Sequence, residues 1–168
     1  TLAKIIVGEI EYQGQLNIGH NVEIGYFAQN QSEYLDGKLT ILQTVEEAAT
    51  ENNRSSVRDM LGAFLFKGDD VDKKVSVLSG GERNRLALCK LLLQPFNFLV
   101  MDEPTNHLDI LSKDVLKKAL KKFQGSLILV SHDRDFLDEL CTKVIEFKNQ
   151  RVKIHLGGVN SYLEENKV

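Results

Sequence analysis

Apolar residues along this chain follow a helical spacing in some stretches and form short unbroken runs in others. Near the start, Leu2, Ile5 and Ile6 share one helical face, and Gly8 is the expected end of that helix. Between residues 39 and 66 the helical spacing predicts two further helices. A third is expected from Ser79 to Leu93, because Pro95 prevents its continuation.

Two unbroken apolar runs, at residues 97–102 and 126–131, predict buried strands of a parallel sheet. Helices are expected after each run, and a final strand pair and two short early strands complete the pattern. These ranges are 112–123 and 135–140 for the helices, 143–147 and 151–155 for the pair, and 15–17 and 23–27 for the early strands. The alternation favours an α/β fold with a parallel sheet. We expect an α/β core of residues 1–30 and 94–168 with a helical subdomain of residues 31–93.

Composition narrows the class of protein. The 168 residues are 42% hydrophobic and 27% charged, which is typical of one soluble globular domain. A net charge of −3 provides no overall attraction to nucleic acid or anionic lipid. No apolar run approaches the roughly 20 residues of a membrane-spanning helix. We expect Cys89 and Cys141 to be buried thiols of a cytoplasmic protein rather than a disulfide or metal ligands.

Polar side chains follow both predicted core strands, and ligands of open α/β sheets bind beyond such carboxyl ends. Asp102 and Glu103 end the first run, as in nucleotidases where the aspartate organises Mg²⁺ and the next carboxylate positions a water. The alternative is a strand that simply turns and exposes both acids. His132 follows the second run, either as a contact to phosphate or water or as an ordinary boundary residue.

The segment LSGGE, residues 78–82, has two interpretations. Ser79 and Glu82 form the capping box of a helix, which requires no ligand. However, Gly80 and Gly81 in a first helical turn cost about 1 kcal/mol each relative to alanine. Missing side chains at a helix N-terminus let a phosphate approach the free N–H groups. The glycines therefore favour a phosphate contact over a simple cap.

Three segments resemble motifs of a known family: 78–88 (LSGGERNRLAL), 98–109 (FLVMDEPTNHLD) and 127–137 (LILVSHDRDFL). They are similar to the signature motif, the Walker B motif with its D-loop, and the switch-histidine region of ATP-binding cassette (ABC) ATPases. EPTNHLD and SHDRDFL look most like the F subfamily (ABC-F), soluble two-cassette proteins that act on ribosomes. Residues 24–31 (IGYFAQNQ) resemble the Q-loop of the second cassette. The resemblance implies a P-loop NTPase-like ABC cassette.

This resemblance also implies roles around ATP and Mg²⁺. Gln29 looks like the Q-loop glutamine, which senses Mg²⁺ and the attacking water. Asp102 resembles the aspartate that holds Mg²⁺ through water, and Glu103 resembles the general base. His132 looks like the switch histidine, which contacts the γ-phosphate.

Two further roles implied by the resemblance lie between cassettes. Asp109 resembles the D-loop aspartate, which crosses the interface of two cassettes. Ser79, Gly80 and Gly81 would contact the γ-phosphate of ATP held mainly by the opposite cassette. Hydrolysis then requires a second cassette, paired head to tail.

The sequence departs from the family at one point, since it contains no GxxxxGK[ST] to cradle the β- and γ-phosphates. TLAKIIVGE resembles the family segment directly after that motif, so our hypothesis is a fragment of a longer ABC-F protein with negligible ATP affinity of its own. A membrane transporter's ATPase subunit and a non-catalytic interaction domain remain as alternatives. The short helical stretch between residues 29 and 78 favours ABC-F. For Lys117, Lys118, Lys121 and Lys122 a solvated helix face is favoured over contact with ribosomal RNA.

Overall fold

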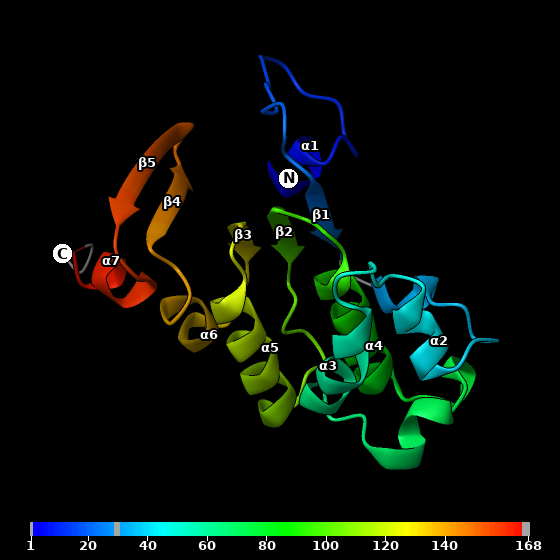
Figure 1. Cartoon of the computed structure of the whole chain (residues 1–168). Coiled ribbons are helices and arrows are strands. Elements are labelled where there is room, and N and C mark those ends of the chain that lie inside the picture. Colours follow the sequence, from blue (N-terminus) through cyan, green and yellow to red (C-terminus); the bar gives the residue numbers. More distant parts are fainter. Residues whose placement is uncertain (1, 29–30, 166–168) are drawn as a thin grey trace.

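A computed structural model describes residues 2–28 and 31–165, and its elements follow the apolar pattern (Figure 1). Helix α1 (Leu2–Ile6) is followed by Gly8 at φ 78°, the left-handed conformation expected at a helix end. The predicted first helix is therefore confirmed. Gln29, our candidate Q-loop residue, lies outside the described residues.

Three parallel strands form the central sheet in the order β1 (Ile24–Phe27), β2 (Phe98–Asp102) and β3 (Ser126–Val130). Strand β2 lies in the middle, and its residues Leu99, Val100 and Met101 are buried. Helix α5 (Ile110–Lys122) connects β2 to β3, as a parallel pair requires. The predicted parallel α/β arrangement is confirmed.

Strand β3 differs from the prediction in its burial. The run at 126–131 was expected to be buried, but Ser126 and Val130 are exposed and the residues between them are only half-buried. The reason lies in the sheet, because no further strand pairs with β3 in the part of the chain that the structure describes. An edge strand loses cover on one side even where its sequence is uniformly apolar.

The helical segment, which we define as residues 31–93, contains α2 (Ile41–Glu46), α3 (Val57–Ala63) and α4 (Gly80–Leu93), joined by short 3₁₀ turns. All three predicted helices are present, with the first two shorter than expected. Their apolar faces pack with the sheet into one core, and the three helices lie below β1 and β2 in Figure 1. Its fully buried side chains include Ile41, Val45, Leu61, Leu86, Leu88, Leu99 and Met101.

Beyond β3 come α6 (Arg134–Asp138), the antiparallel strands β4 (Lys143–Lys148) and β5 (Arg151–Leu156), and α7 (Val159–Glu165). The predicted final strand pair is confirmed. It forms a hairpin separate from the three-stranded sheet (Figure 1). The register places five apolar side chains on one side of the hairpin, and each is between 46% and 79% exposed. This apolar hairpin face consists of Ile145, Phe147, Val152, Ile154 and Leu156.

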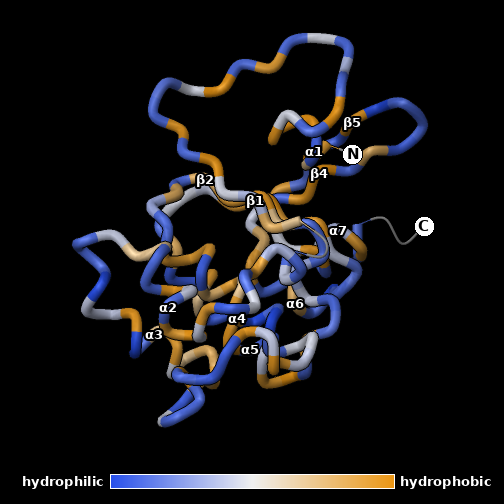
Figure 2. The backbone as a smooth tube through the Cα atoms, turned by 90° about the vertical axis from the view of Figure 1, so that its right-hand side faces the viewer, coloured by the Kyte–Doolittle hydropathy of each residue, from blue (hydrophilic) through white to orange (hydrophobic). Residues whose placement is uncertain are grey.

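One predicted strand is wrong. Residues 15–17 lie in an irregular, exposed segment that arches away from the rest of the chain between α1 and β1 (Figure 2). A strand needs a partner, and no pairing is found for these residues in the described chain. The far end of this segment is held by Asn97, whose amide donates to the Asn21 carbonyl at 2.7 Å and accepts from the Glu23 N–H at 2.9 Å.

The two cysteines were expected to be buried thiols. Both cysteines are free; Cys89 is fully buried, whereas Cys141, next to the hairpin, is only half-buried. The prediction of a buried thiol therefore holds for Cys89 alone.

None of the described helices combines the length and the hydropathy needed to cross a bilayer.

Candidate functional site

The ends of β2 and β3 bring the candidate catalytic residues together. Asp102 lies opposite Val130, and the Glu103 N–H donates to the Val130 carbonyl at 2.8 Å. Beyond this bond, the Glu103 carboxylate lies 3.6 Å from His132 Nε2 and accepts from the His132 backbone N–H at 3.4 Å. The two strand ends that the sequence analysis singled out therefore form one site.

Glu103 and His132 have very different surroundings. The Glu103 side chain is 14% exposed, while that of His132 is 99% exposed. Glu103 also has a φ of 52°, a left-handed conformation that costs a non-glycine residue about 1 to 3 kcal/mol. Such a conformation is retained only where the surrounding structure enforces it. Here it directs a nearly buried carboxylate toward the site, and the imidazole remains free to meet a ligand.

The loop that carries His132 is tied to α5. Lys113 Nζ lies 2.6 Å from Asp133 Oδ2, and Asp133 also caps α6 by accepting from the Phe136 N–H at 3.1 Å. The hydrogen bond from Lys113, followed by that from Phe136, lowers the pKa of Asp133. Ser131 Oγ and Thr105 Oγ1 lie 3.2 Å apart and join this loop to the one that follows β2. The backbone on both sides of His132 is thus fixed.

Neighbouring carboxylates at the end of β2 face different spaces. Glu103 lines a cavity of about 340 Å³ that it shares with Gly80, Gly81 and His107. Asp102 lines a larger groove of about 960 Å³ beside β3 and the hairpin. The structure therefore separates the candidate metal ligand from the candidate base while keeping them adjacent in the chain.

A magnesium ion is compatible with this arrangement. The described residues contain no group of three or more metal-binding side chains. Mg²⁺ usually keeps several waters and is held by one or two carboxylates together with substrate phosphates. Asp102, half-buried at the carboxyl edge of the sheet, fits this role.

The N-terminus of α4 has the predicted capping box. Ser79 Oγ accepts from the Glu82 N–H at 3.3 Å and donates to Glu82 Oε2 at 2.7 Å, and the Ser79 N–H donates to the same oxygen at 2.8 Å. These bonds lower the pKa of Glu82. A Cβ atom added at Gly80 would meet nothing within 4 Å in the described chain. The chain's own packing therefore does not explain the glycine at position 80.

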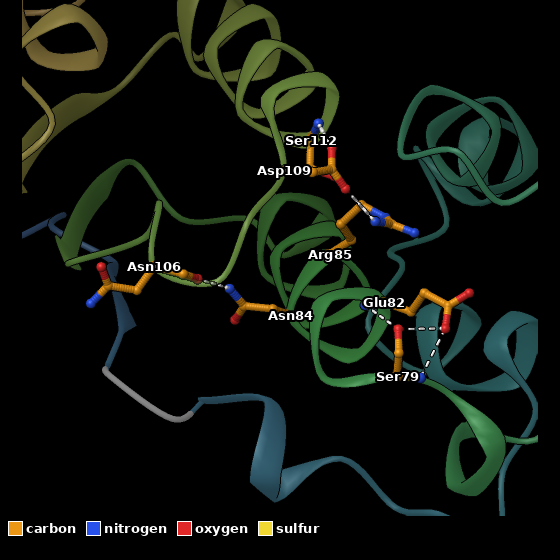
Figure 3. A network of polar contacts seen from close by, with 7 residues as sticks. All are labelled: Ser79, Glu82, Asn84, Arg85, Asn106, Asp109 and Ser112. Carbon is orange, nitrogen blue, oxygen red and sulfur yellow. Dashed lines mark hydrogen bonds and ion pairs between the residues drawn. The ribbon is translucent and has the colours of Figure 1, made fainter.

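Asp109 takes a structural position within the same chain. It caps α5 by accepting from the Ser112 N–H at 2.8 Å, and its second carboxylate oxygen lies 3.4 Å from Arg85 Nη1 (Figure 3). The bonds from Ser112 lower the pKa of Asp109. Asp109 is not among the described residues that line the cavity shared by Glu103 and the glycines.

Two residues that the sequence analysis did not single out connect these parts. Asn84 Nδ2 donates to the Asn106 carbonyl at 3.1 Å, and Arg85 contacts both Asp109 and Ser112 (Figure 3). The signal for Arg85 was present in the sequence. It lies three and four residues before the fully buried Leu88 and Cys89, so a charge interrupts an apolar helical stripe.

The lysine-rich side of α5 is only partly a solvated surface. Lys117 and Lys121 each donate to Glu139 at 2.7 Å, and the Lys117 side chain is mostly buried. Lys118 and Lys122 are exposed, as expected. Two of the four cations are thus engaged by a carboxylate of the same chain.

A parallel sheet with carboxylates at its edge, next to a glycine-containing helix N-terminus, is the arrangement of a nucleotide-binding α/β cassette. The sequence profile of the family described as "ABC transporter" matches residues 1–106. The chain therefore belongs to the ABC family of ATPases.

Relatives and solved structures agree with this assignment. ABC transporter F family members 5 and 2 of Arabidopsis thaliana are 47% and 45% identical to the chain over 168 residues. These alignments cover 99% of this chain but only 24% and 25% of those proteins, so the chain spans about a quarter of their length. A solved structure named RNase-L Inhibitor matches 98% of the chain with a TM-score of 0.72, covering 34% of that structure. At 21% identity this match shows the ABC cassette fold alone.

Proposed function

We propose that this chain is an ATP-hydrolysing cassette of a larger ABC-F protein, in which ATP closes two cassettes head to tail and hydrolysis reopens them. The observation that carries the proposal is the contact between Glu103 and His132 at the carboxyl edge of the sheet. In this account residues 31–93 act as the helical subdomain. Gln29, outside the described residues, is the proposed sensor of Mg²⁺ and water.

Glu103 is the proposed general base. Its carboxylate is nearly buried, so it stays in one place and can accept a proton from a water that attacks the γ-phosphate. His132, with its exposed ring, is proposed to contact the γ-phosphate from the neighbouring strand. Asp102 would hold Mg²⁺, which supplies neutralisation of phosphate charge when it is bound.

The N-terminus of α4 is proposed to bind ATP held mainly by the opposite cassette. Gly80 has open space where a side chain would lie, and α4 presents the positive end of a 14-residue helix there. Ser79 contributes its hydroxyl once it releases Glu82. Asp109 is proposed to reach across the same interface.

Contacts to the β-phosphate must come from outside these 168 residues, because they contain no GxxxxGK[ST]. We therefore expect the isolated chain to have negligible affinity for ATP. Calorimetric binding of ATP to the isolated chain in the micromolar range would contradict this expectation.

The Glu103→Gln substitution in the two-cassette protein tests the catalytic assignment. We expect ATP turnover to fall at least about 100-fold, since the amide cannot accept the proton. Glu47→Gln, which neutralises an exposed carboxylate of the helical segment, is the matched control and should retain wild-type turnover. Turnover of Glu103→Gln close to that of the wild type would refute the role of Glu103.

We further propose that the full-length protein acts on the ribosome, in the cytoplasm. The motifs EPTNHLD and SHDRDFL, whose resemblance to ABC-F proteins implies such a role, are the support within this chain. A structure of similar fold, at 21% identity, contains the archaeal ribosome recycling factor aABCE1 with the ribosomal stalk protein aP1. Co-sedimentation with ribosomes distinguishes this role from that of a transporter subunit. We expect Glu103→Gln protein to pellet with ribosomes only when ATP is present; absence from the pellet in both conditions would contradict the ribosomal role.

A further inference from the structure

Arg85 is a nearly buried cation where the helical segment meets the start of α5. Its side chain is only 14% exposed, and it projects from α4 toward the start of α5 (Figure 3). Nη1 donates to Ser112 Oγ at 3.1 Å and to Asp109 Oδ2 at 3.4 Å. Within the helical segment, to which α4 belongs, its guanidinium carbon lies 5.6 Å from the centre of the Phe66 ring. One side chain thus contacts the helical segment and the residues that begin α5.

Stability alone does not account for an arginine at this position. Removing a cation from water is costly, and Arg85 Nε is buried with no hydrogen-bond partner found in the part of the chain that the structure describes. Asp109 is exposed and the ion pair is long, so their attraction is well screened. An apolar side chain would suit a stripe that continues with Leu88 and Cys89. The arginine is therefore better explained by what it holds in place.

Helix α4 contacts the loop of residues 103–109 and fixes its position. Asn84, the neighbour of Arg85, donates to the Asn106 carbonyl at 3.1 Å. One turn earlier, a Cβ atom at Gly81 would lie 3.4 Å from the His107 carbonyl oxygen, so the helix and the loop are in close contact. The loop begins with Glu103 and ends with Asp109, which Arg85 contacts. Both ends of the proposed catalytic loop are thus fixed, one by β3 and the other by α4 and α5.

We propose that Arg85 is a positioning residue that couples the helical segment to the loop of residues 103–109. It keeps the carboxylate of Glu103 in register with the N-terminus of α4, and it acts without touching the nucleotide. Asn84 lines the cavity that holds Glu103, whereas Arg85 is not among its described lining residues. This inference rests on the proposed ATPase function for its kinetic test, while hydrogen exchange tests it independently of that function.

The kinetic test is Arg85→Lys in the two-cassette protein. Lysine keeps the charge but lacks the guanidinium plane that lies over the Phe66 ring, so its amine is not held in the orientation from which Nη1 reaches Ser112 and Asp109. We expect kcat for ATP hydrolysis to fall about tenfold, with KM for ATP within about twofold of the wild type and an unchanged melting temperature. Arg58→Lys, on the exposed surface of α3, is the matched control and should leave kcat unchanged. Wild-type kcat in Arg85→Lys would overturn the proposal.

A double substitution identifies the contact through which Arg85 acts. Ser112→Ala removes the hydroxyl that Arg85 binds while leaving the backbone N–H that Asp109 caps. If both act through one contact, adding Ser112→Ala to Arg85→Lys should lower kcat by less than about twofold further. If the fold-loss of kcat in the double variant instead equals the product of the losses in the two single variants, Arg85 acts through a different contact and the proposal fails.

Hydrogen exchange provides the test that does not depend on ATP turnover. In Arg85→Lys we expect amides of residues 105–112 to exchange at least about threefold faster, with those of α2 (Ile41–Glu46) unchanged. If the wild-type protein proves not to hydrolyse ATP, the proposed function fails while this readout still tests the positioning role. Unchanged exchange at residues 105–112 would overturn the positioning role, whatever happens to kcat.

Discussion

The helical segment and the C-terminal hairpin are built from similar apolar residues but hold them in opposite ways. In the helical segment, stripes at helical spacing meet the sheet and are fully buried, with Leu61 and Leu86 as examples. In the hairpin, apolar residues at every second position of β5 and at positions 145 and 147 of β4 form a face that remains exposed. A pattern therefore determines which side of an element is apolar, while burial depends on what packs against that side. We expect the stability of this chain to reside in the helical segment and the sheet.

The largest expected effect comes from truncating a leucine in each region. Leu86→Ala in α4 should lower the free energy of unfolding by about 2 to 5 kcal/mol, because it leaves a cavity in a closed core. Leu156→Ala in the hairpin is the matched control and should change it by less than about 0.5 kcal/mol, since that side chain is exposed. Urea unfolding of the two variants measures both values. Equal losses of unfolding free energy in the two variants would contradict the difference in burial between the helical segment and the hairpin.

The two cysteines provide a second test of the same contrast. Burial raises the pKa of both thiols, and Cys89 in α4 is the more deeply buried. Cys141, next to the hairpin, should react with a chromogenic disulfide reagent at least about tenfold faster, because thiolate and access are both needed. The Cys141→Ser variant should show only slow labelling that follows unfolding. Faster labelling of Cys89 would contradict the assigned burial.

The capping box of α4 has a smaller expected effect. Ser79→Ala should cost about 1 kcal/mol of stability, because the hydroxyl caps the Glu82 N–H. The pKa of Glu82 is lowered in the folded chain, so its stabilising effect is present above the ordinary value of 4.5 and is lost as pH falls below it. Urea midpoints between pH 7 and 3 test both points. A cost for Ser79→Ala that does not shrink with falling pH would argue against a shared capping box.

The smallest effect concerns the ion pairs between α5 and Glu139. The bonds from Lys117 and Lys121 lower the pKa of Glu139 from 4.5 to about 2. Their stabilising effect should be complete above pH 4.5 and disappear as pH falls toward 2. An NMR titration of the Glu139 carboxyl measures this pKa directly. A midpoint near 4.5 would show that the lysines are solvated in solution, and would restore the interpretation of α5 as a fully solvated lysine face.

Periodicity predicted most elements, because each helix and strand has its own apolar spacing. It also singled out Glu103 and His132 as residues that follow two core strands, and the pairing of β2 with β3 in the structure is what brings them together. It was wrong about residues 15–17 and about the burial of β3, because both depend on a partner strand and not on local sequence. Arg85 was missed for a similar reason: the spacing shows that it faces inward but not that the loop of residues 103–109 lies opposite.

The most direct test of the central claim, that Glu103 acts as the base on ATP, is nucleotide retention by the two-cassette protein. After incubation with radiolabelled ATP and rapid removal of free nucleotide, the Glu103→Gln protein should retain unhydrolysed ATP in a closed pair of cassettes. The wild-type protein should instead release ADP. Recovery of ADP from the Glu103→Gln protein at the wild-type rate would contradict the account.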